Sequence, residues 1–312
     1  MGFKVLITDG LEKEGIDIIN AAGEAVDKKG IEAPELLQII GEYDGLIVRG
    51  RTKVTKEVFE AAKNLKVVGR AGVGVDNIDL VAAKEHGVTV VNAPVATTIA
   101  VAELGFGMML ALVRDIPHTD SEMKHDRWTK KDYVGHELNG KTLGVVGYGN
   151  IGSTIGKYAQ ALGMKVLCYD PLRNPDEMRA TGAEPVQLDD IYARADIITF
   201  HVPLIPETKH MVNDETFAKM KDGVRIVDAS RGGVIEQAAL LGALQSGKVA
   251  GAALDVYEKE PPVDWELAKH PKVIATPHIG GQTIEAQNRA AEDISSEVMN
   301  VLQGKELRWK IC

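Results

Sequence analysis

The chain has 312 residues, a length that suits two domains, each with its own hydrophobic core. A formal net charge of −9 at pH 7 argues against a nucleic-acid partner, because non-specific binding to phosphates requires clustered positive charge. The two cysteines, Cys168 and Cys312, exclude a disulfide framework and match no metal motif, so we expect a metal-free protein of a reducing, cytoplasmic compartment.

The first half of the chain alternates between strand-like and helix-like segments. Its apolar runs predict strands at Lys4–Thr8, Gly45–Arg49, Lys66–Arg70 and Val88–Asn92. The intervening patterns predict helices at Leu11–Ala22, Ala33–Gly41 and Lys56–Lys63. The N-terminus therefore has the pattern of a first strand and lacks the long apolar core and cleavage site of a signal peptide.

The second half repeats this alternation. Its apolar runs predict strands at Thr142–Gly147, Lys165–Asp170, Asp196–His201, Val224–Ala229, Ala250–Asp255 and Val273–Thr276. Continuous β-rich runs separated by helices are typical of parallel strands that are covered on both faces. The whole pattern predicts an α/β protein with two doubly wound parallel-sheet domains.

Two long helices stand out from this alternation. Ile99–Arg114 is apolar almost all round, so we expect it to be buried between domains or subunits. Glu103, which lies on this helix, would then need a partner. Because the helix contains that acid and is too short, it does not predict a membrane span, and we expect no membrane partner. Thr283–Leu302 follows the final strand, and periodicity alone does not assign it to either half.

A predicted strand runs into Gly147–Gly152, which matches the pattern GxGxxG of dinucleotide-binding turns. The first glycine allows a tight turn, the second lets the backbone approach a pyrophosphate, and the third lets helix and strand pack closely. The motif alone is a weak signal, and a purely structural turn is its alternative. Asp170 strengthens it, because an acid ending the next strand can bind the adenosine ribose and repel a 2′-phosphate. We therefore expect NAD and not NADP.

Three polar residues, Arg231, Glu260 and His278, each follow a predicted strand of the second half. The carboxyl ends of parallel strands meet at one edge of a sheet, so these side chains can converge beside the cofactor. A histidine can take a hydroxyl proton while hydride leaves, a carboxylate can orient the imidazole, and an arginine can hold a substrate carboxylate. Each residue alone is also consistent with a surface charge or a loop histidine, and spacing does not choose His278 over His201.

Several segments resemble the D-isomer-specific 2-hydroxyacid dehydrogenase family over nearly the whole chain. They are residues 69–77, 138–144, 147–152, 229–233, 251–262 and 277–281. The resemblance implies NAD-dependent hydride transfer at C2 of a small 2-hydroxy acid. It implies that Arg231 orients the substrate, that His278 is the acid–base residue, and that Glu260 is the acid paired with His278.

The resemblance also implies contacts to the cofactor and to the substrate carboxylate. The cofactor residues would be Val73, Gly147, Gly149, Asn150, Ile151, Gly152, Asp170, Val202, Ala229, Ser230, Asp255, Gly280 and Gly281. Val73 and Gly74 are similar to a pair of backbone N–H groups that receive the carboxylate, a role that suits adjacent amides.

In this family the cofactor domain is inserted into the substrate domain. The resemblance therefore implies a flavodoxin-like substrate-binding domain of residues 1–97 and 283–312, and a Rossmann-type NAD-binding domain of residues 98–282. The last helix would then cross back to the first half. Residues 98–135 resemble the dimerisation region of the family, and Trp128 in a charged stretch suits an interface, so we expect a homodimer.

Three arginines bear on the choice of substrate. Family members that oxidise 3-phosphoglycerate carry arginines at the positions of Arg49, Arg51 and Arg70 to hold the phosphate, which the guanidinium fork matches. We therefore expect a cationic pocket and oxidation of D-3-phosphoglycerate to 3-phosphohydroxypyruvate, the first step of serine biosynthesis. A set of surface charges is the alternative.

Two other functions stay open. A reductase of glyoxylate or hydroxypyruvate, or another D-2-hydroxyacid dehydrogenase, would have the same fold without needing the phosphate pocket. An NAD-sensing co-repressor would also share the fold, but we would expect it to carry extra tails and a peptide-binding groove. The chain departs from many relatives at Thr97, and because it stops at Cys312 we expect no serine-sensing regulatory domain.

Overall fold

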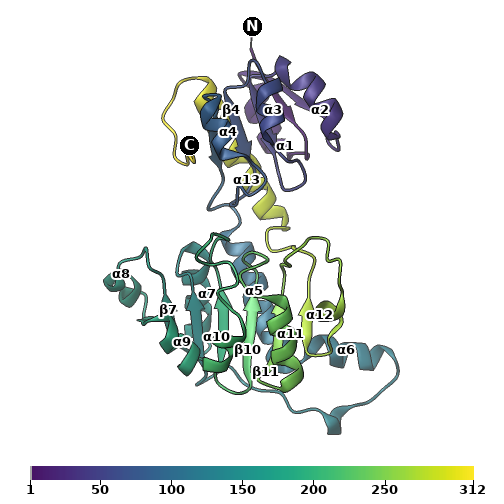
Figure 1. Cartoon of the computed structure of the whole chain (residues 1–312), viewed down its shortest axis with the longest axis vertical. Coiled ribbons are helices and arrows are strands. Elements are labelled where there is room, and N and C mark those ends of the chain that lie inside the picture. Colours follow the sequence, from purple (N-terminus) through teal and green to yellow (C-terminus); the bar gives the residue numbers. More distant parts are fainter. Residues whose placement is uncertain (1) are drawn as a thin grey trace. The chain divides into compact units, whose positions relative to one another are not determined.

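The computed structural model describes residues 2–312 and divides into two compact units, coloured along the chain in Figure 1. Unit 1 contains the residues up to Thr98 together with Gly281–Cys312, and unit 2 contains Ile99–Gly280. These boundaries lie one or two residues from those expected from the sequence. Each unit is built on its own parallel sheet, which confirms the predicted fold class.

Unit 1 has five parallel strands in the order β2-β1-β3-β4-β5. They are β1 (Phe3–Ile7), β2 (Gly23–Asp27), β3 (Gly45–Val48), β4 (Val67–Arg70) and β5 (Thr89–Asn92). This is the flavodoxin-like order, in which the direction of winding reverses between β1 and β3. The sequence did not predict β2, because this edge strand is short, partly exposed and contains two acids.

Helix α13 brings the end of the chain into the core of unit 1, where the yellow helix meets the purple segments in Figure 1. The helices of this unit are α1 (Lys13–Asn20), α2 (Ala33–Ile39), the short η1 (Ile40–Glu42), α3 (Lys56–Ala61), α4 (Leu80–Glu85) and α13 (Ile284–Leu302). Ile294 and Val298 of α13 pack with Val5 and Ile47 of the sheet. A Cβ at Gly69 would lie 2.6 Å from the Val298 side chain, so this glycine permits the close approach of helix and sheet.

The residues after α13 pair with the outer edge of β5. Buried Glu297 accepts hydrogen bonds from the backbone N–H groups of Arg308 (2.9 Å) and Trp309 (3.1 Å). Farther along, Val90 accepts from the Ile311 N–H at 2.8 Å and donates to the Cys312 carbonyl at 3.1 Å. The tail thus satisfies backbone groups that an edge strand would otherwise leave open.

Unit 2 has seven parallel strands in the order β12-β11-β10-β9-β6-β7-β8. They are β6 (Thr142–Val146), β7 (Lys165–Tyr169), β8 (Glu184–Pro185), β9 (Ile197–Phe200), β10 (Val224–Asp228), β11 (Val249–Leu254) and β12 (Val273–Ala275). Counted from β6, this is the Rossmann order extended by one strand. The sequence did not predict β8, because two residues carry no periodic pattern.

Helix α5 packs one face into the core of unit 2 and leaves the other face exposed. The helices of the unit are α5 (Thr98–Arg114), α6 (Ile116–Lys124), η2 (Lys130–Asp132), α7 (Asn150–Ala161), α8 (Pro175–Ala180), α9 (Leu188–Arg194), α10 (Asp214–Lys219), α11 (Gln237–Ser246) and α12 (Glu266–Lys269). Met109 and Val113 are buried, whereas Ile99 is 46% exposed and Glu103 is exposed. The single chain thus leaves one face of α5 and Glu103 exposed, and burial of that face between subunits stays a prediction.

The helices were also compared with the length and apolarity that a bilayer requires. None of those formed by residues 2–312 meets both requirements.

Candidate active site

The glycine loop connects β6 to α7 at the carboxyl edge of the unit 2 sheet. Gly147 has a φ of 87°, and a Cβ there would lie 2.4 Å from the His201 carbonyl oxygen. A Cβ at Gly152 would lie 2.1 Å from the Gly147 carbonyl oxygen. Gly149 differs, because a Cβ there would meet nothing within 4 Å. The fold itself therefore requires two of the three glycines, while Gly149 leaves open space beside the loop.

The start of α7 and the end of β7 add groups that suit a dinucleotide. Asn150 and Ile151 open the helix, and no side chain caps its N-terminus, so N–H groups and the positive end of the dipole are available to a phosphate. Asp170 accepts hydrogen bonds from the N–H groups of Tyr148 and Leu172, both at 2.9 Å. This leaves further lone pairs on the Asp170 carboxylate for a ribose hydroxyl. Together, the open loop, the uncapped helix and the acid fit NAD.

His278 and Glu260 form a hydrogen-bonded pair. His278 Nδ1 lies 2.6 Å from Glu260 Oε2, and Glu260 Oε1 accepts the Tyr257 N–H at 3.1 Å. The hydrogen bond to Glu260 raises the pKa of His278 above 6.5, against the opposing effect of burial. Burial favours a raised pKa for Glu260, but the hydrogen bond and charge of His278 prevail and lower it. The pair therefore stabilises the protonated imidazole next to an ionised carboxylate.

Arg231 lies within electrostatic range of this pair. It follows β10, and its Nη1 donates to the Ser230 carbonyl at 2.7 Å. Burial and the hydrogen bond within the pair have the largest effects on the pKa values of Glu260 and His278. The positive charge of Arg231 has a smaller effect and lowers both pKa values. Unit 2 thus brings together the three residues that the sequence proposed as catalytic.

Asp255 holds the loop that carries His278. This acid is buried at the end of β11, where Oδ1 accepts from the Thr276 hydroxyl (2.6 Å) and the Ile279 N–H (2.8 Å). Its Oδ2 accepts the Gly280 N–H at 2.8 Å. His278 has a φ of 55°, in the left-handed region that non-glycine residues rarely adopt. The carboxylate therefore anchors the loop on both sides of a strained residue, a role that the sequence did not predict.

A second buried acid, Asp228, anchors the turn that carries Arg231. Its Oδ1 accepts from the Ser230 N–H at 2.9 Å and from the Ser230 hydroxyl at 2.6 Å. Burial raises the pKa of Asp228 to about 6. Ser230 and Ala229, predicted to contact the cofactor, are both buried, and the Ser230 hydroxyl is engaged in this turn. Asp228 was not predicted from the sequence, although it ends β10 and acids directly follow two other strands of the sheet, Asp170 after β7 and Asp255 after β11.

His201 lies at the end of β9, beside the glycine loop. Its Nε2 is 2.9 Å from the Thr199 hydroxyl, its Nδ1 is buried, and burial lowers the pKa of His201 to about 3. Such an imidazole stays neutral near pH 7 and resists taking up a proton, so the environment favours His278 as the acid–base residue. Val202, the next residue and a predicted cofactor contact, is partly exposed at this edge.

The other predicted residues belong to unit 1. Val73 and Gly74 follow β4, and within residues 2–312 neither N–H group donates a hydrogen bond. Asn92 holds this turn through a 2.6 Å hydrogen bond from Nδ2 to the Val73 carbonyl. The two adjacent N–H groups suit an anion. Gly281 is the first residue of the second segment of unit 1, and its carbonyl accepts from Gln287 Nε2 at 2.6 Å.

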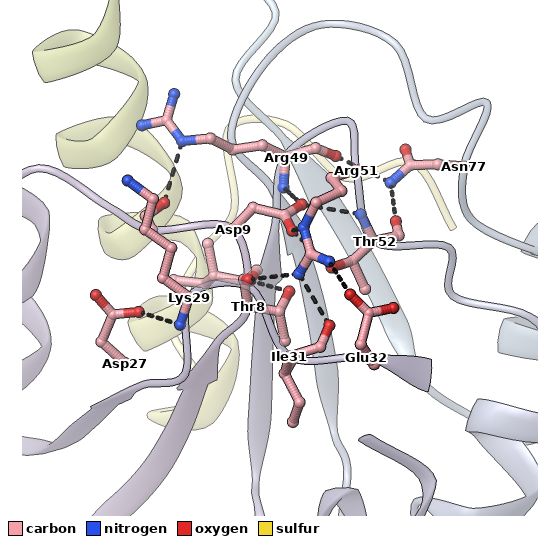
Figure 2. A network of polar contacts seen from close by, with 12 residues as sticks. Thr8, Asp9, Asp27, Lys29, Ile31, Glu32, Arg49, Arg51, Thr52 and Asn77 are labelled. Carbon is pink, nitrogen blue, oxygen red and sulfur yellow. Dashed lines mark hydrogen bonds and ion pairs between the residues drawn. The ribbon is translucent and has the colours of Figure 1, made fainter. Parts of the chain in front are cut away.

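Arg49 and Arg51, which were predicted to bind phosphate, have carboxylate partners, and Figure 2 shows those of Arg51. Arg49 forms an ion pair with Glu12. Arg51 Nε lies 3.2 Å from Asp9 Oδ1, and its Nη1 lies 3.7 Å from Glu32 Oε1. The cationic pocket expected from the sequence is thus partly neutralised by acids that follow β1 and β2, which no sequence pattern had indicated.

Backbone contacts hold these arginines further in place. Arg51 Nη2 donates to the carbonyls of Thr8 (3.1 Å) and Ile31 (3.0 Å), as Figure 2 shows. Asn77 Nδ2 donates to the Arg49 carbonyl at 2.9 Å. Arg70, the third arginine, donates from Nη1 to the carbonyl of the following residue at 3.0 Å. Any phosphate bound here would have to compete with carboxylates for Arg49 and Arg51.

We also searched residues 2–312 for a metal site. No group of three or more His, Cys, Asp and Glu side chains in this range is arranged to hold a metal ion.

Comparison with known proteins gives one family match and a set of longer relatives. Residues 106–280 match the family described as D-isomer specific 2-hydroxyacid dehydrogenase, NAD binding domain. The chain is 45% identical over 305 residues to D-3-phosphoglycerate dehydrogenase of Rattus norvegicus. The aligned region covers 97% of this chain and 57% of the relative. The chain thus spans little more than half the length of this curated protein.

Solved structures resemble the chain over almost its full length. A D-lactate dehydrogenase from Aquifex aeolicus, complexed with NAD and lactic acid, is 31% identical with a TM-score of 0.86, covering 96% of each chain. A glyoxylate reductase from Paecilomyes thermophila is 29% identical with a TM-score of 0.91, covering 99% of this chain and 98% of that one.

Proposed function

The chain belongs to the D-isomer-specific 2-hydroxyacid dehydrogenase family, and from this premise we propose that it oxidises D-3-phosphoglycerate to 3-phosphohydroxypyruvate with NAD. The observation that carries the proposal is the His278–Glu260 pair, in a unit whose glycine loop fits NAD. The curated relative supports the choice of substrate by its name. The reaction would be the first step of serine biosynthesis.

Each residue of the trio has a distinct task in this proposal. His278 takes the proton of the C2 hydroxyl during oxidation and returns it during reduction. Glu260 occupies His278 Nδ1, which leaves Nε2 for the substrate hydroxyl. Arg231 holds the substrate carboxylate and orients C2. NAD, when bound, accepts the hydride that leaves C2.

Other residues of the two units would hold the cofactor and the substrate anions. The uncapped start of α7 and the space beside Gly149 receive the pyrophosphate, and Asp170 receives the adenosine ribose. In unit 1, the N–H groups of Val73 and Gly74 bind an anionic oxygen of the substrate. Asp255 acts on the reaction through the His278 loop that it anchors.

We assign the substrate phosphate to Arg49, Arg51 and Arg70, with the largest effect at Arg51. The side chain of Arg51 is 46% exposed and its partner Glu32 is 84% exposed, so a phosphate can reach the guanidinium and replace Glu32 at little cost. Arg49 is only 17% exposed, and its ion pair with Glu12 is correspondingly harder to replace. Substrate choice therefore depends mainly on Arg51.

A substrate panel tests the proposal. We expect NADH formation with D-3-phosphoglycerate to exceed that with D-glycerate, D-lactate and glycolate in kcat/KM by at least about tenfold, the effect of one good charged contact. Equal or greater kcat/KM with an unphosphorylated acid would overturn the phosphoglycerate assignment while leaving the dehydrogenase chemistry in place. Absence of NADH formation with all four acids would overturn both.

One observation favours a second candidate. Because Glu12, Asp9 and Glu32 already neutralise Arg49 and Arg51, unit 1 also suits a substrate without a phosphate. The second candidate is therefore a reductase of glyoxylate or hydroxypyruvate. Its signature would be NADH oxidation that is faster with hydroxypyruvate than with 3-phosphohydroxypyruvate.

We further propose a homodimer formed through residues 98–135. The exposed face of α5 is largely apolar, and Trp128 is 76% exposed on the same segment. Exposed large apolar groups of this kind favour burial against another chain. Light scattering should give the mass of two chains, and Trp128→Ala should shift the equilibrium toward one. A cytoplasmic location stays a prediction.

A further inference from the structure

A pocket of about 140 Å³ opens in unit 2, at the amino-terminal edge of the sheet. Its walls come from the residues that precede or begin β6, β9 and β10, together with Val113 of α5 and His136. In a parallel sheet this edge is opposite the one that carries the glycine loop, Asp170 and the trio. The pocket is therefore separate from the proposed NAD and substrate groups of unit 2.

Most acids around this pocket already have cationic partners. The charged residues that line it are Glu137, Lys141, Asp196, Lys221, Asp222 and Arg225. Asp196 Oδ1 lies 2.9 Å from Lys221 Nζ, and Asp222 Oδ1 lies 2.8 Å from the Nζ of Lys248, which adjoins the pocket. Glu137 is exposed and makes no ion pair within residues 2–312. The carboxylates of Asp196 and Asp222 are thus neutralised locally.

Arg225 lacks such a partner. It is partly buried at the start of β10, and its guanidinium makes no hydrogen bond or ion pair with any group in the described chain. Burial lowers the pKa of Arg225, which reflects the cost of holding this charge without a counter-ion. Lys141 likewise makes no ion pair there. Five guanidinium donors and one ammonium therefore remain available at the pocket.

His136 completes a set of three basic groups. The charge of Arg225, followed by burial and the charge of Lys141, lowers the pKa of His136 below its usual 6.5. All three residues line the same pocket. Arg225 and Lys141 are both positive at pH 7, and Glu137 is the one acid of the pocket lining without an ion pair within residues 2–312, so the local potential favours an anion.

We propose that Arg225, Lys141 and His136 bind a small phosphate-bearing anion in this pocket. A guanidinium fork matches two phosphate oxygens, while an ammonium and an imidazole supply donors for the others. The combined charge suits a dianion better than a single carboxylate. Free phosphate and the phosphate of a small ester share this chemistry.

Binding of an anion in this pocket would affect the segment of residues 114–135. The His136 N–H donates to the Val113 carbonyl at 2.9 Å, which joins the two ends of the intervening segment, residues 114–135. An anion held between His136 and Arg225 would connect the base of this segment to β10. Phosphate should therefore slow amide hydrogen exchange around residues 113 and 136.

The test follows the pKa of His136 by NMR in the full-length protein, with NADH at saturation to occupy the glycine loop. Inorganic phosphate should raise the pKa of His136, because the bound anion offsets the charges of Arg225 and Lys141. Sodium chloride at equal ionic strength should raise it far less. An equal shift with both salts would mean general screening and would overturn the proposal.

Variants locate the effect. Arg225→Gln should weaken phosphate binding at least about tenfold, and Lys141→Gln about threefold, because each removes charged donors. Arg179→Gln, which changes an exposed arginine of α8, is the matched control and should leave phosphate binding unchanged. All three variants should keep NADH affinity. If Arg225→Gln bound phosphate as tightly as the wild type, or if it failed to fold and Lys141→Gln bound phosphate as tightly as the wild type, the site would be excluded.

Discussion

His278 Nδ1 lies 2.6 Å from Glu260 Oε2, although 18 positions separate the two residues and each follows a different strand. The hydrogen bond raises the pKa of His278, and Asp255 anchors the loop in which its backbone is strained. Proton affinity and position of this imidazole therefore depend on two different acids, which can be altered separately.

Glu260→Gln should move the pH dependence of oxidation. Only neutral His278 can take the hydroxyl proton, so kcat/KM should fall as the pH drops through the pKa of His278. Since Glu260 raises that pKa, the variant should place the acidic limb at lower pH and reduce the maximal rate. Rate profiles between pH 5 and 9 measure both effects. An acidic limb at the same pH in the variant would contradict the assigned role of the pair.

Asp255→Asn should disturb the His278 loop. The amide cannot accept all three hydrogen bonds that the carboxylate accepts, so we expect a loss of about 1–3 kcal/mol in stability and a kcat at least about tenfold lower. Thermal unfolding and steady-state rates measure these changes. Thr276→Val removes one of the three bonds and should have a smaller effect. Unchanged kcat in Asp255→Asn would show that the anchor is dispensable.

Gly149→Ala and Gly152→Ala form a matched pair. The added Cβ at Gly149 meets nothing within 4 Å, so this variant should fold normally and yet bind NADH at least about tenfold more weakly, because the methyl group enters the space assigned to the pyrophosphate. At Gly152 the added Cβ would lie 2.1 Å from a carbonyl oxygen, so this variant should lose stability. Thermal unfolding and NADH fluorescence separate the two outcomes. Normal NADH affinity in Gly149→Ala would argue against that placement.

Arg51→Gln should raise KM for D-3-phosphoglycerate about tenfold and leave KM for an unphosphorylated acid nearly unchanged, because a phosphate contact is lost. Lys53→Gln, which removes an exposed positive charge two residues away, is the control. Parallel increases for both substrates would point to a general effect on unit 1. They would favour the reductase of unphosphorylated acids.

His201 should make the fold sensitive to acid. Its pKa is about 3 in the folded chain, against 6.5 for an ordinary histidine, so its contribution is fully present above pH 6.5 and is lost as the pH falls toward 3. Between pH 7 and 5 this loss amounts to about 2 kcal/mol. Asp228 acts in the opposite direction, because its pKa of about 6 lets the fold gain stability as the pH drops through that value.

Comparison of the wild-type chain with His201→Asn isolates the histidine, since Asp228 is common to both. Urea unfolding at pH 7 and pH 5 should show a smaller loss of stability in the variant. Equal losses would mean that His201 can be protonated in the folded state.

Sequence patterns predicted the buried strands and the NAD-binding domain well, and the family match confirms the latter. Buried parallel strands such as β6 and β9 are mostly apolar, so they stand out in the sequence. The edge strands β2 and β8 do not, because one is partly exposed and the other has two residues. Apolar patterns therefore do not predict strands that are exposed or very short.

The details of the site depended on contacts that no local pattern encodes. Glu12 lies 37 positions from Arg49, so its ion pair exists only once the strands are assembled. Choosing between His201 and His278 required their environments, because both follow strands of the same sheet. The anchoring role of Asp255 likewise became visible only from its three hydrogen bonds.

The placement of α13 in the core of unit 1 has a consequence for biosynthesis. Ile294 and Val298 are translated only after the whole of Ile99–Gly280, so the ribosome releases a complete unit 2 while unit 1 still lacks part of its interior. The segment that is made first should therefore reach its native state last, the reverse of the usual order for domains along a chain. Pulse-labelled hydrogen exchange on stalled nascent chains should detect protected amides in β6 before β1.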